Sequence, residues 1–460
     1  MTDGRDDEGF RISRRRALAI GGAAALSLAS TRRLPRFDAA SDPSSDGDGR
    51  GGSDVADEPI ARVHDAGVTG AGVDVAVLDP TGFDPTHEAL ADAVADIRQF
   101  GPERAVVDRT THGTAAAAAV ARLAPDTALS LASFREQSAF VDAVEWCRER
   151  GTDVILAPVA AHGAVARPGT DVYRAVRRAI RAGCSVVAPT GNAALGHWRG
   201  PLAAVAADGD ADPTRLAVRP LSADGAGSGS VRGRFVAWLV ADAEDRTDLT
   251  LALLRAVDDG ERWNLVAVSQ PAASRAGQRL VADLDAGTHA LVVRSAAAAR
   301  SAGGGARTGR IEVTTPTHAL SPARPLGSIA VPASVPGVVG VGVTDGNSPA
   351  AGADSPTATT ADAVAPYSGR GPTPEGATGV DVVAPPRPWI ADDSPGTSAA
   401  AARTAGVVAL LRGAAPSLSP ADVVTALRAS AGDVGRPGTD LASGWGRLDA
   451  VAAVQRARSR

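Results

Sequence analysis

Residues 396–411, GTSAAAARTAGVVALL, give the strongest indication of fold and chemistry in the chain. Small and apolar residues dominate the stretch, so it predicts a buried helix that begins near Ser398. A helix N-terminus offers unpaired backbone N–H groups and a partial positive charge, which stabilise an oxyanion forming beside a hydroxyl. Ser398 is therefore a candidate nucleophile. The simpler interpretation is a helix cap, because serine is common at that position.

A serine nucleophile needs a general base and an orienting acid, and the sequence upstream offers both. Asp79 ends the apolar run 75–78, which predicts a buried strand. His112 precedes a run of small residues. Asn192 ends a second predicted strand, and its side-chain amide is the kind of donor that completes an oxyanion hole. The chain order is Asp, His, Asn, Ser.

This order and these local sequences resemble the subtilisin-like serine peptidases, also called subtilases or peptidase S8 type, in which the three groups follow a different order from chymotrypsin-like enzymes. Further segments carry the resemblance: YSGRGPT at 367–373, DVVAP at 381–385 and SGWGRLDA at 443–450. It covers roughly residues 55–200 and 322–455. Several separate motifs in one order make chance agreement improbable.

The resemblance implies a serine endopeptidase that hydrolyses peptide bonds through an acyl-enzyme. Ser398 would be the nucleophile, His112 the general base and then acid, and Asp79 the buried acid that fixes the imidazole tautomer. Asn192 would donate to the oxyanion. The partner is a protein or peptide substrate, and the chemistry needs no cofactor.

Two departures from the family pattern affect this site. Pro80 is an extra residue after Asp79, which raises the hypothesis that Asp79 is displaced relative to His112. The Ser-x-Gly-Gly segment that borders the S1 pocket and pairs with the substrate backbone is here replaced by Pro158, Val159, Ala160 and Ala161. Added β-carbons narrow that cleft. The sequence therefore predicts restricted specificity, with small side chains or none at P1, the residue before the scissile bond.

The pattern of apolar residues predicts an α/β fold with a mostly parallel sheet and helices on both faces, interrupted by a β-sandwich. Strands and helices alternate after residue 55, and period-two alternation replaces them between about 201 and 321. The turn at 285–288 gives this module a weak resemblance to a jelly roll, and we expect it to screen or recruit substrate. The predicted organisation is a signal peptide (1–30), a disordered linker (31–54), a first catalytic part (55–200), the inserted module (201–321) and a second catalytic part (322–460).

The N-terminal segment predicts export. Arginines at 14–16 precede the apolar stretch 19–29 in a long polar leader of the twin-arginine type, so we expect a secreted or cell-surface protein. The apolar stretch is too short for a stable membrane span. The alternative is a basic, disordered N-terminal arm.

Composition narrows the class of protein. A chain of 460 residues with 44% hydrophobic content supports a large core, and a net charge of −5 with dispersed arginines gives no nucleic-acid signature.

Cys147 and Cys184 are expected to be buried thiols, with a bridge between them as the alternative. The acidic turn 208–212 offers oxygens to a structural calcium ion but lacks the rest of a calcium loop. We expect a monomer. The six histidines other than His112 show no metal spacing, and most are expected in surface or turn positions.

Two functions of different class follow from these patterns. The first is the exported serine endopeptidase, which the presence of Asp79, His112, Asn192 and Ser398 favours. The second is a catalytically silent scaffold of the same fold that binds peptides or surface partners, which the altered wall 158–161 favours.

Overall fold

The computed structural model describes residues 54–90, 92–102, 104–201, 206–207, 215–222, 225–226, 229–241, 249–257, 260–270, 277–295, 309–345, 363–386 and 396–459. The predicted signal peptide, the predicted linker up to residue 53 and the acidic segment 208–212 lie outside these residues. Those assignments stay predictions.

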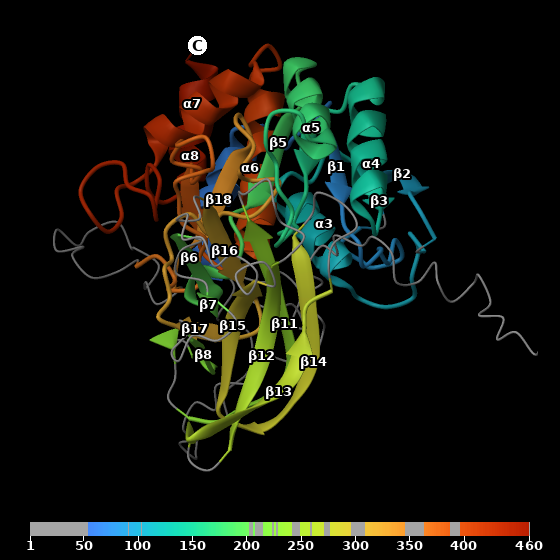
Figure 1. Ribbon diagram of the computed structural model, residues 1–460. Coiled ribbons are helices and arrows are strands. Elements are labelled where there is room, and N and C mark those ends of the chain that lie inside the picture. Colours follow the sequence, from blue (N-terminus) through green and yellow to red (C-terminus); the bar gives the residue numbers. More distant parts are fainter. Residues whose placement is uncertain are drawn as a thin grey trace, which may run out of the picture.

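A seven-stranded parallel sheet forms the centre of the larger part of the molecule (Figure 1). Its strand order is β19-β18-β5-β4-β1-β3-β2, so segments far apart in the sequence lie side by side. The strands are short and almost wholly buried in the centre, which is typical of a sheet covered on both faces. They are β1 (Asp74–Leu78), β2 (Val94–Gln99), β3 (Ala128–Ser133), β4 (Val154–Leu156), β5 (Ser185–Pro189), β18 (Val339–Val343) and β19 (Val382–Ala384).

Helices cover both faces of this sheet, because side chains alternate along each strand. In β1, Val75 and Val77 join one buried cluster, and Ala76 and Leu78 join the other. The predicted α/β architecture with helices on both faces is confirmed. The first cluster includes α2 (Asp54–Asp65), α3 (His112–Leu123), α6 (Thr397–Ala414), α7 (Pro420–Ser430) and α8 (Ala450–Arg458), and the second includes α4 (Gln137–Arg150) and α5 (Asp171–Arg181).

The small residues of α3 and α6 allow these two helices to pack closely. The alanines at 115–119 of α3 and at 399–402 of α6 are all buried. A β-carbon on Gly406 would lie only 2.7 Å from the Cβ of Leu123. Interiors are packed too densely to absorb such an overlap without movement. The lack of side chains at these positions therefore fixes the distance between α3 and α6.

Between β5 and β18 the chain forms a β-sandwich of mostly antiparallel strands (Figure 1). One sheet has the order β14-β11-β16-β6, and the other β13-β12-β15-β8-β17, with β7 beside β15. Apolar side chains of both sheets share one buried cluster. The predicted inserted sandwich is thus confirmed, with its first strand starting at His197.

The elements of this region, in chain order, are η1 (Ala194–Gly196), β6 (His197–Pro201), β7 (Ala206–Ala207), β8 (Leu216–Arg219), β9 (Leu221–Ser222), β10 (Gly225–Ala226), β11 (Val231–Ala241), β12 (Leu249–Val257), β13 (Arg262–Val268), β14 (Gln278–Gly287), β15 (His289–Ser295), β16 (Arg310–Thr314) and β17 (Ala319–Ser321). Strands β9 and β10 form a separate two-stranded sheet.

The two cysteines are free, buried thiols, as the first interpretation predicted. Cys147 lies in α4, and Cys184 directly precedes β5. Burial raises the pKa of Cys147, and it raises the pKa of Cys184 to about 11, so both thiols are protonated at neutral pH. The structure contains no disulfide bond between Cys147 and Cys184, so the alternative interpretation is wrong.

Most histidines are buried, which corrects the expectation that they occupy surface or turn positions. His162, His197, His289 and His318 are each at most 8% exposed. All four pack against or within the sandwich region, where neighbouring strands supply the apolar surroundings. The spacing of the histidines along the chain gave no sign of this burial.

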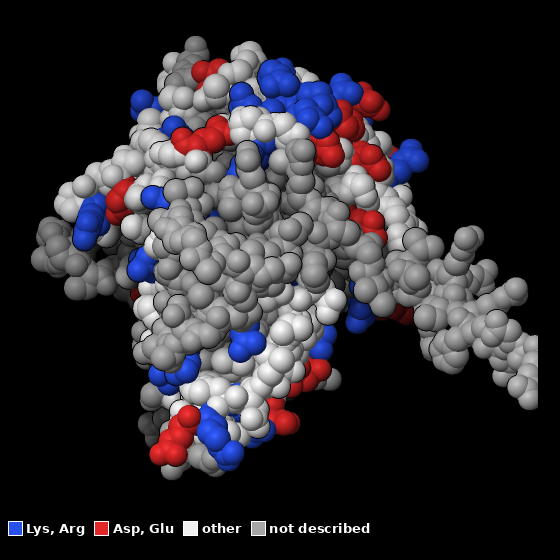
Figure 2. Space-filling view, viewed as in Figure 1, with Lys and Arg blue, Asp and Glu red and all other residues white. Residues whose placement is uncertain are grey.

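On the face shown in Figure 2, basic side chains gather over α5, and acidic side chains lie beside them toward α4. Glu145 of α4 accepts hydrogen bonds from Arg148 at 2.6 Å and from Arg178 of α5 at 2.7 Å. Such exposed pairs add little to stability, but they join the two helices. Among the residues described here, no helix has the length and apolar character to cross a bilayer.

The stability of the sandwich is expected to fall as the pH is lowered. Burial lowers the pKa of His318 to about 4, against 6.5 for an ordinary histidine, and the nearby His289 acts in the same direction. Between these two values the unfolded chain binds a proton that the native protein does not, so the free energy of unfolding decreases from about pH 6.5 to about pH 4. His318→Phe keeps a ring against Phe235, whose centroid lies 5.3 Å away.

The variant should therefore lose less stability than the wild type between pH 7 and pH 5, as measured by urea unfolding at a series of pH values. An equal loss in both proteins would contradict the assignment of a buried, neutral His318.

Candidate active site

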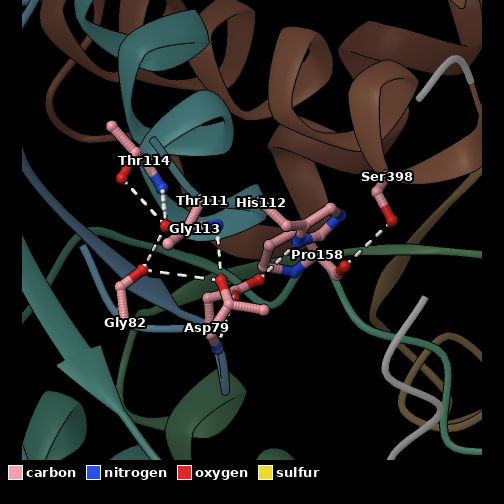
Figure 3. A network of polar contacts seen from close by, with 9 residues as sticks. Asp79, Gly82, Thr111, His112, Gly113, Thr114, Pro158 and Ser398 are labelled. Carbon is pink, nitrogen blue, oxygen red and sulfur yellow. Dashed lines mark hydrogen bonds and ion pairs between the residues drawn. The ribbon is translucent and has the colours of Figure 1, made fainter. Parts of the chain in front are cut away.

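Asp79 and His112 are in direct contact. Asp79 follows the last residue of β1 and is fully buried, and His112 is the first residue of α3. The Oδ2 atom of Asp79 lies 2.6 Å from Nδ1 of His112 (Figure 3). The imidazole is about one-fifth exposed, so its other edge faces the open side of the site. This is the arrangement in which a carboxylate orients an imidazole for proton transfer.

Pro80 does not displace Asp79, which answers the hypothesis raised by the sequence. Asp79, Pro80 and Thr81 form a turn in which Oδ1 of Asp79 accepts hydrogen bonds from the backbone N–H of Thr81 at 2.8 Å and from its hydroxyl at 2.5 Å. Proline restricts the backbone to a conformation that suits such a turn. Oδ2 is left for His112.

Thr81 also connects Asp79 to the helix that begins with His112. Its Oγ1 accepts a hydrogen bond from the backbone N–H of Gly113 at 3.0 Å. A β-carbon on Gly113 would lie 2.6 Å from the carbonyl oxygen of Gly82 and 3.0 Å from Cβ of Asp79. Glycine is therefore required where α3 meets the turn, and this explains the glycine after His112.

Ser398 is not the cap of its helix. The cap position of α6 belongs to Gly396, and no side chain caps the helix there. The hydroxyl of Ser398 instead donates a hydrogen bond to the carbonyl oxygen of Pro158 at 2.9 Å (Figure 3). Its side chain is partly exposed at the positive end of α6. The interpretation of Ser398 as an ordinary cap is therefore wrong.

Asn192 lies over the start of α6. Its Oδ1 accepts hydrogen bonds from the backbone N–H of Thr397 at 3.0 Å and from the Thr397 hydroxyl at 2.8 Å. Because Oδ1 accepts both hydrogen bonds, the amide nitrogen of Asn192 points away from Thr397. A β-carbon on Gly396 would lie 2.9 Å from that nitrogen, so glycine is needed beneath it.

The wall 158–161 follows β4 and alternates in direction. Val159 and Ala161 belong to the buried cluster around α4 and α5, whereas Ala160 faces Gly191 on the other side. The backbone N–H of Ala161 donates to the carbonyl oxygen of Val331 at 2.8 Å. The wall is therefore held from behind by apolar packing and at its end by a backbone hydrogen bond.

All of these groups meet at one edge of the parallel sheet. The neighbouring strands β5, β4 and β1 end, respectively, just before Asn192, Pro158 and Asp79. The closely packed helices α3 and α6 bring His112 and Ser398 to the same edge. Sites in open α/β sheets form at the carboxyl ends of the strands, and these groups lie at that edge.

No group of three or more potential metal ligands occurs within the part of the chain that the structure describes. The candidate calcium turn at 208–212 lies outside that part. Neither observation tests the prediction that the chemistry needs no cofactor, or the candidate calcium ion.

The family model for subtilases matches residues 70–446. The chain belongs to the subtilase family. It is a serine-type peptidase, and its substrates are peptides or proteins. No curated protein sequence matches this chain.

Solved subtilisin-like proteases share the fold of this subtilase. The CspB protease of Clostridium perfringens aligns with a TM-score of 0.59 at 16% sequence identity, over 88% of this chain and 99% of that one. A lanthipeptide protease aligns with a TM-score of 0.47 at 17% identity, over 87% of this chain and 94% of that one. The first likeness extends the shared fold over nearly the whole described chain.

Sequence reasoning missed Thr81 and His162. Thr81 forms hydrogen bonds with both Asp79 and the first turn of α3, which carries His112. A signal for it was present, because Asp-Pro-Thr occurs twice, at 79–81 and 84–86, and Thr86 bonds to Asp84 in the same way. His162 follows the wall and is buried, and no local pattern predicts that position.

Removing the hydroxyl of Thr81 should weaken catalysis without unfolding the protein. In Thr81→Val the side chain keeps its shape, but Asp79 and Gly113 each lose a hydrogen bond, so the acid is held less firmly against His112. We expect kcat to fall by about 10-fold to 100-fold with little change in KM, measured on a short peptide substrate.

The matched control is Thr86→Val in the second Asp-Pro-Thr turn. Thr86 donates the same two hydrogen bonds to Asp84 that Thr81 donates to Asp79, but this turn does not contact His112. Equal losses in both variants would mean that the turns matter only for stability.

Proposed function

We propose that this subtilase is an exported serine endopeptidase in which Asp79, His112 and Ser398 hydrolyse peptide bonds through an acyl-enzyme. The observation that carries the proposal is the 2.6 Å contact of Asp79 with His112 at the sheet edge where Ser398 opens α6. Asn192 and the N-terminus of α6 flank the same position, where a carbonyl oxygen would gain negative charge.

The proposed reaction begins when a peptide carbonyl is placed beside Ser398. His112 removes the proton of the hydroxyl as Oγ attacks the carbonyl carbon, and Asp79 stabilises the imidazolium that results. His112 then gives this proton to the leaving amine, and the C–N bond breaks. Water, activated by the same imidazole, hydrolyses the acyl-enzyme and restores the serine.

Substrate binding is proposed to free the hydroxyl for this step. In the structure the hydroxyl of Ser398 donates its hydrogen bond to the carbonyl oxygen of Pro158, which belongs to the wall. A substrate strand that pairs with the wall brings an N–H to the same region and competes for this acceptor. Rotation about the Cα–Cβ bond of Ser398 then directs Oγ toward the imidazole.

Restricted specificity at P1 is part of the proposal. The segment 330–331 bridges the two sides of the cleft, because Ala330 N–H donates to the Thr190 carbonyl at 2.9 Å and Ala161 N–H donates to the Val331 carbonyl at 2.8 Å. The side of the wall that faces Gly191 carries the β-carbon of Ala160. Residues 330–331 would form the floor of the P1 subsite and residues 158–161 its wall. This arrangement supports a subsite that accepts glycine or alanine.

Export and the class of the sandwich are proposed on separate grounds. The twin-arginine route rests on the sequence of residues 13–29, which the structure does not describe. A jelly-roll assignment is supported by the strand order, in which the chain crosses repeatedly between the four-stranded sheet β14-β11-β16-β6 and the six-stranded sheet that contains β13-β12-β15-β8-β17 and β7.

Labelling with a fluorophosphonate tests the nucleophile. Purified protein should form a covalent adduct, Ser398→Ala should form none, and His112→Ala should react at least 100-fold more slowly because the hydroxyl keeps its proton. Asn192→Ala should lower kcat by about 100-fold to 1,000-fold, since one oxyanion donor is lost. The adduct is detected by intact-protein mass spectrometry, and kcat by peptide hydrolysis.

A control for unspecific labelling is Ser443→Ala, because Ser443 is buried and far along the chain from the proposed site. Folded wild-type protein that neither labels nor hydrolyses peptides would instead support the silent scaffold.

A peptide library tests the specificity. Products of cleavage should carry glycine or alanine at P1, because larger side chains meet the floor and the wall. Mass spectrometry of the cleaved library gives the profile. Dominance of large aromatic residues at P1 would refute the restricted subsite while leaving the triad intact.

A further inference from the structure

The turn His162-Gly163 lies between the cleft and the inserted sandwich. It follows the wall directly, and His162 is only 6% exposed. A β-carbon built on Gly191 would lie 3.3 Å from Cε1 of His162, 3.2 Å from Cβ of Ala330 and 3.5 Å from Cβ of Ala160. Three side chains thus converge on one point beside Asn192, and the imidazole is the largest of them.

The position beside Gly191 where these three side chains converge belongs to the proposed P1 subsite. A carbonyl under attack must lie close to Ser398 and to the amide of Asn192. Ser398 contacts the wall at Pro158, and Asn192 continues the segment that contains Gly191. The side chain before the scissile bond therefore enters the space between the wall and Gly191, where the imidazole of His162 stands.

The alternating direction of the wall explains why His162 points there. Val159 and Ala161 face the buried cluster behind the wall, so Ala160 and His162 face the opposite side. Their neighbours around Gly191 confirm that direction. A substitution at residue 162 consequently changes the cleft rather than the core behind the wall.

The sandwich holds this turn from the other side. Gly163 has a φ of +78°, and a β-carbon there would lie 2.5 Å from Cε3 of Trp238, a residue of β11 that is 1% exposed. The carbonyl oxygen of Gly163 accepts a hydrogen bond from the backbone N–H of Gly277 at 2.8 Å. The indole thus packs directly on the backbone of the turn, and the chain before β14 fixes its carbonyl.

The same sheet supplies the remaining surroundings of His162. Glu312 of β16 and His197 of β6 are its nearest charged or titratable neighbours, and their own contact is 3.5 Å between Nε2 of His197 and Oε1 of Glu312. Burial lowers the pKa of His162 to about 4, so the imidazole is neutral near pH 7. A neutral, enclosed ring acts here through its volume.

We propose that His162 limits the P1 subsite and that Trp238 of the inserted sandwich holds it in place, so that the inserted module sets the specificity of the cleft. The inference rests on the proposed function and deepens it by naming the substrates: peptides with glycine or alanine before the scissile bond. His162 is a specificity-determining residue, and Trp238 is a positioning residue that acts through the turn.

The test uses a set of internally quenched peptides that are identical except for glycine, alanine, leucine or phenylalanine at P1. His162→Ala should raise the ratio of kcat/KM for the leucine peptide to that for the glycine peptide by about 10-fold or more, because a ring is removed from the subsite. His318→Ala is the matched control. It removes another buried histidine whose pKa is about 4, within the sandwich, and should leave that ratio unchanged.

The role of the sandwich is tested in the same way. Trp238→Ala should raise the leucine-to-glycine ratio, because the turn relaxes toward the space left by the indole, and Trp238→Phe should restore most of the wild-type ratio. Phe235→Ala is the control for general loss of stability, since Phe235 is a fully buried residue of the same strand. Circular dichroism identifies any variant that does not fold.

An unchanged ratio in folded His162→Ala would overturn the inference, and so would equal shifts in Trp238→Ala and Phe235→Ala. Failure of the proposed function looks different, because wild-type protein would then hydrolyse none of the peptides. In that case the subsite is tested by calorimetry, with Ser398→Ala and peptides that end in glycine or leucine. His162→Ala in that background should favour the leucine peptide by a similar factor, and an unchanged preference would again refute the inference.

Discussion

The close contact between α3 and α6 is the constraint on which the site depends. Each helix carries one of the proposed reacting groups in its first turn, so the distance between the helices decides whether the proposed base and nucleophile share a site. Gly406 against Leu123, together with the buried alanines of both helices, sets that distance. Larger side chains would separate the helices and therefore the reacting groups. The long small-residue runs are thus as much a part of the site as His112 and Ser398.

The sequence predicted the fold, and it singled out residues that the structure brings together at the sheet edge, because each has a local pattern. Apolar runs mark the strands before Asp79 and Asn192, and the small and apolar residues after Ser398 mark α6. Asp79 and Asn192 stand out in the sequence because they are polar residues that follow apolar runs. The effect of Pro80 could not be predicted in this way, because the insertion is accommodated by hydrogen bonds of Asp79 with Thr81, which spacing alone does not reveal.

The buried histidines and the junction with the sandwich were missed for a different reason. Contacts such as Gly163 with Trp238 join residues far apart in the sequence, and neither residue has a neighbourhood that predicts the other. Burial of His162 results from three segments that meet only in the folded chain. Patterns of hydrophobicity describe which face of an element is buried, but they do not say which element covers it.

The hydrogen bond between Gly277 and Gly163 has a consequence for the history of this chain. An appended module can be exchanged for another without harm when a linker separates it from the enzyme. Here the module contributes backbone contacts to the rim of the cleft, so recombination with a foreign sandwich would require compensating changes on both sides of the joint. The two parts are therefore expected to be inherited together, as one evolutionary unit rather than as an enzyme with an accessory.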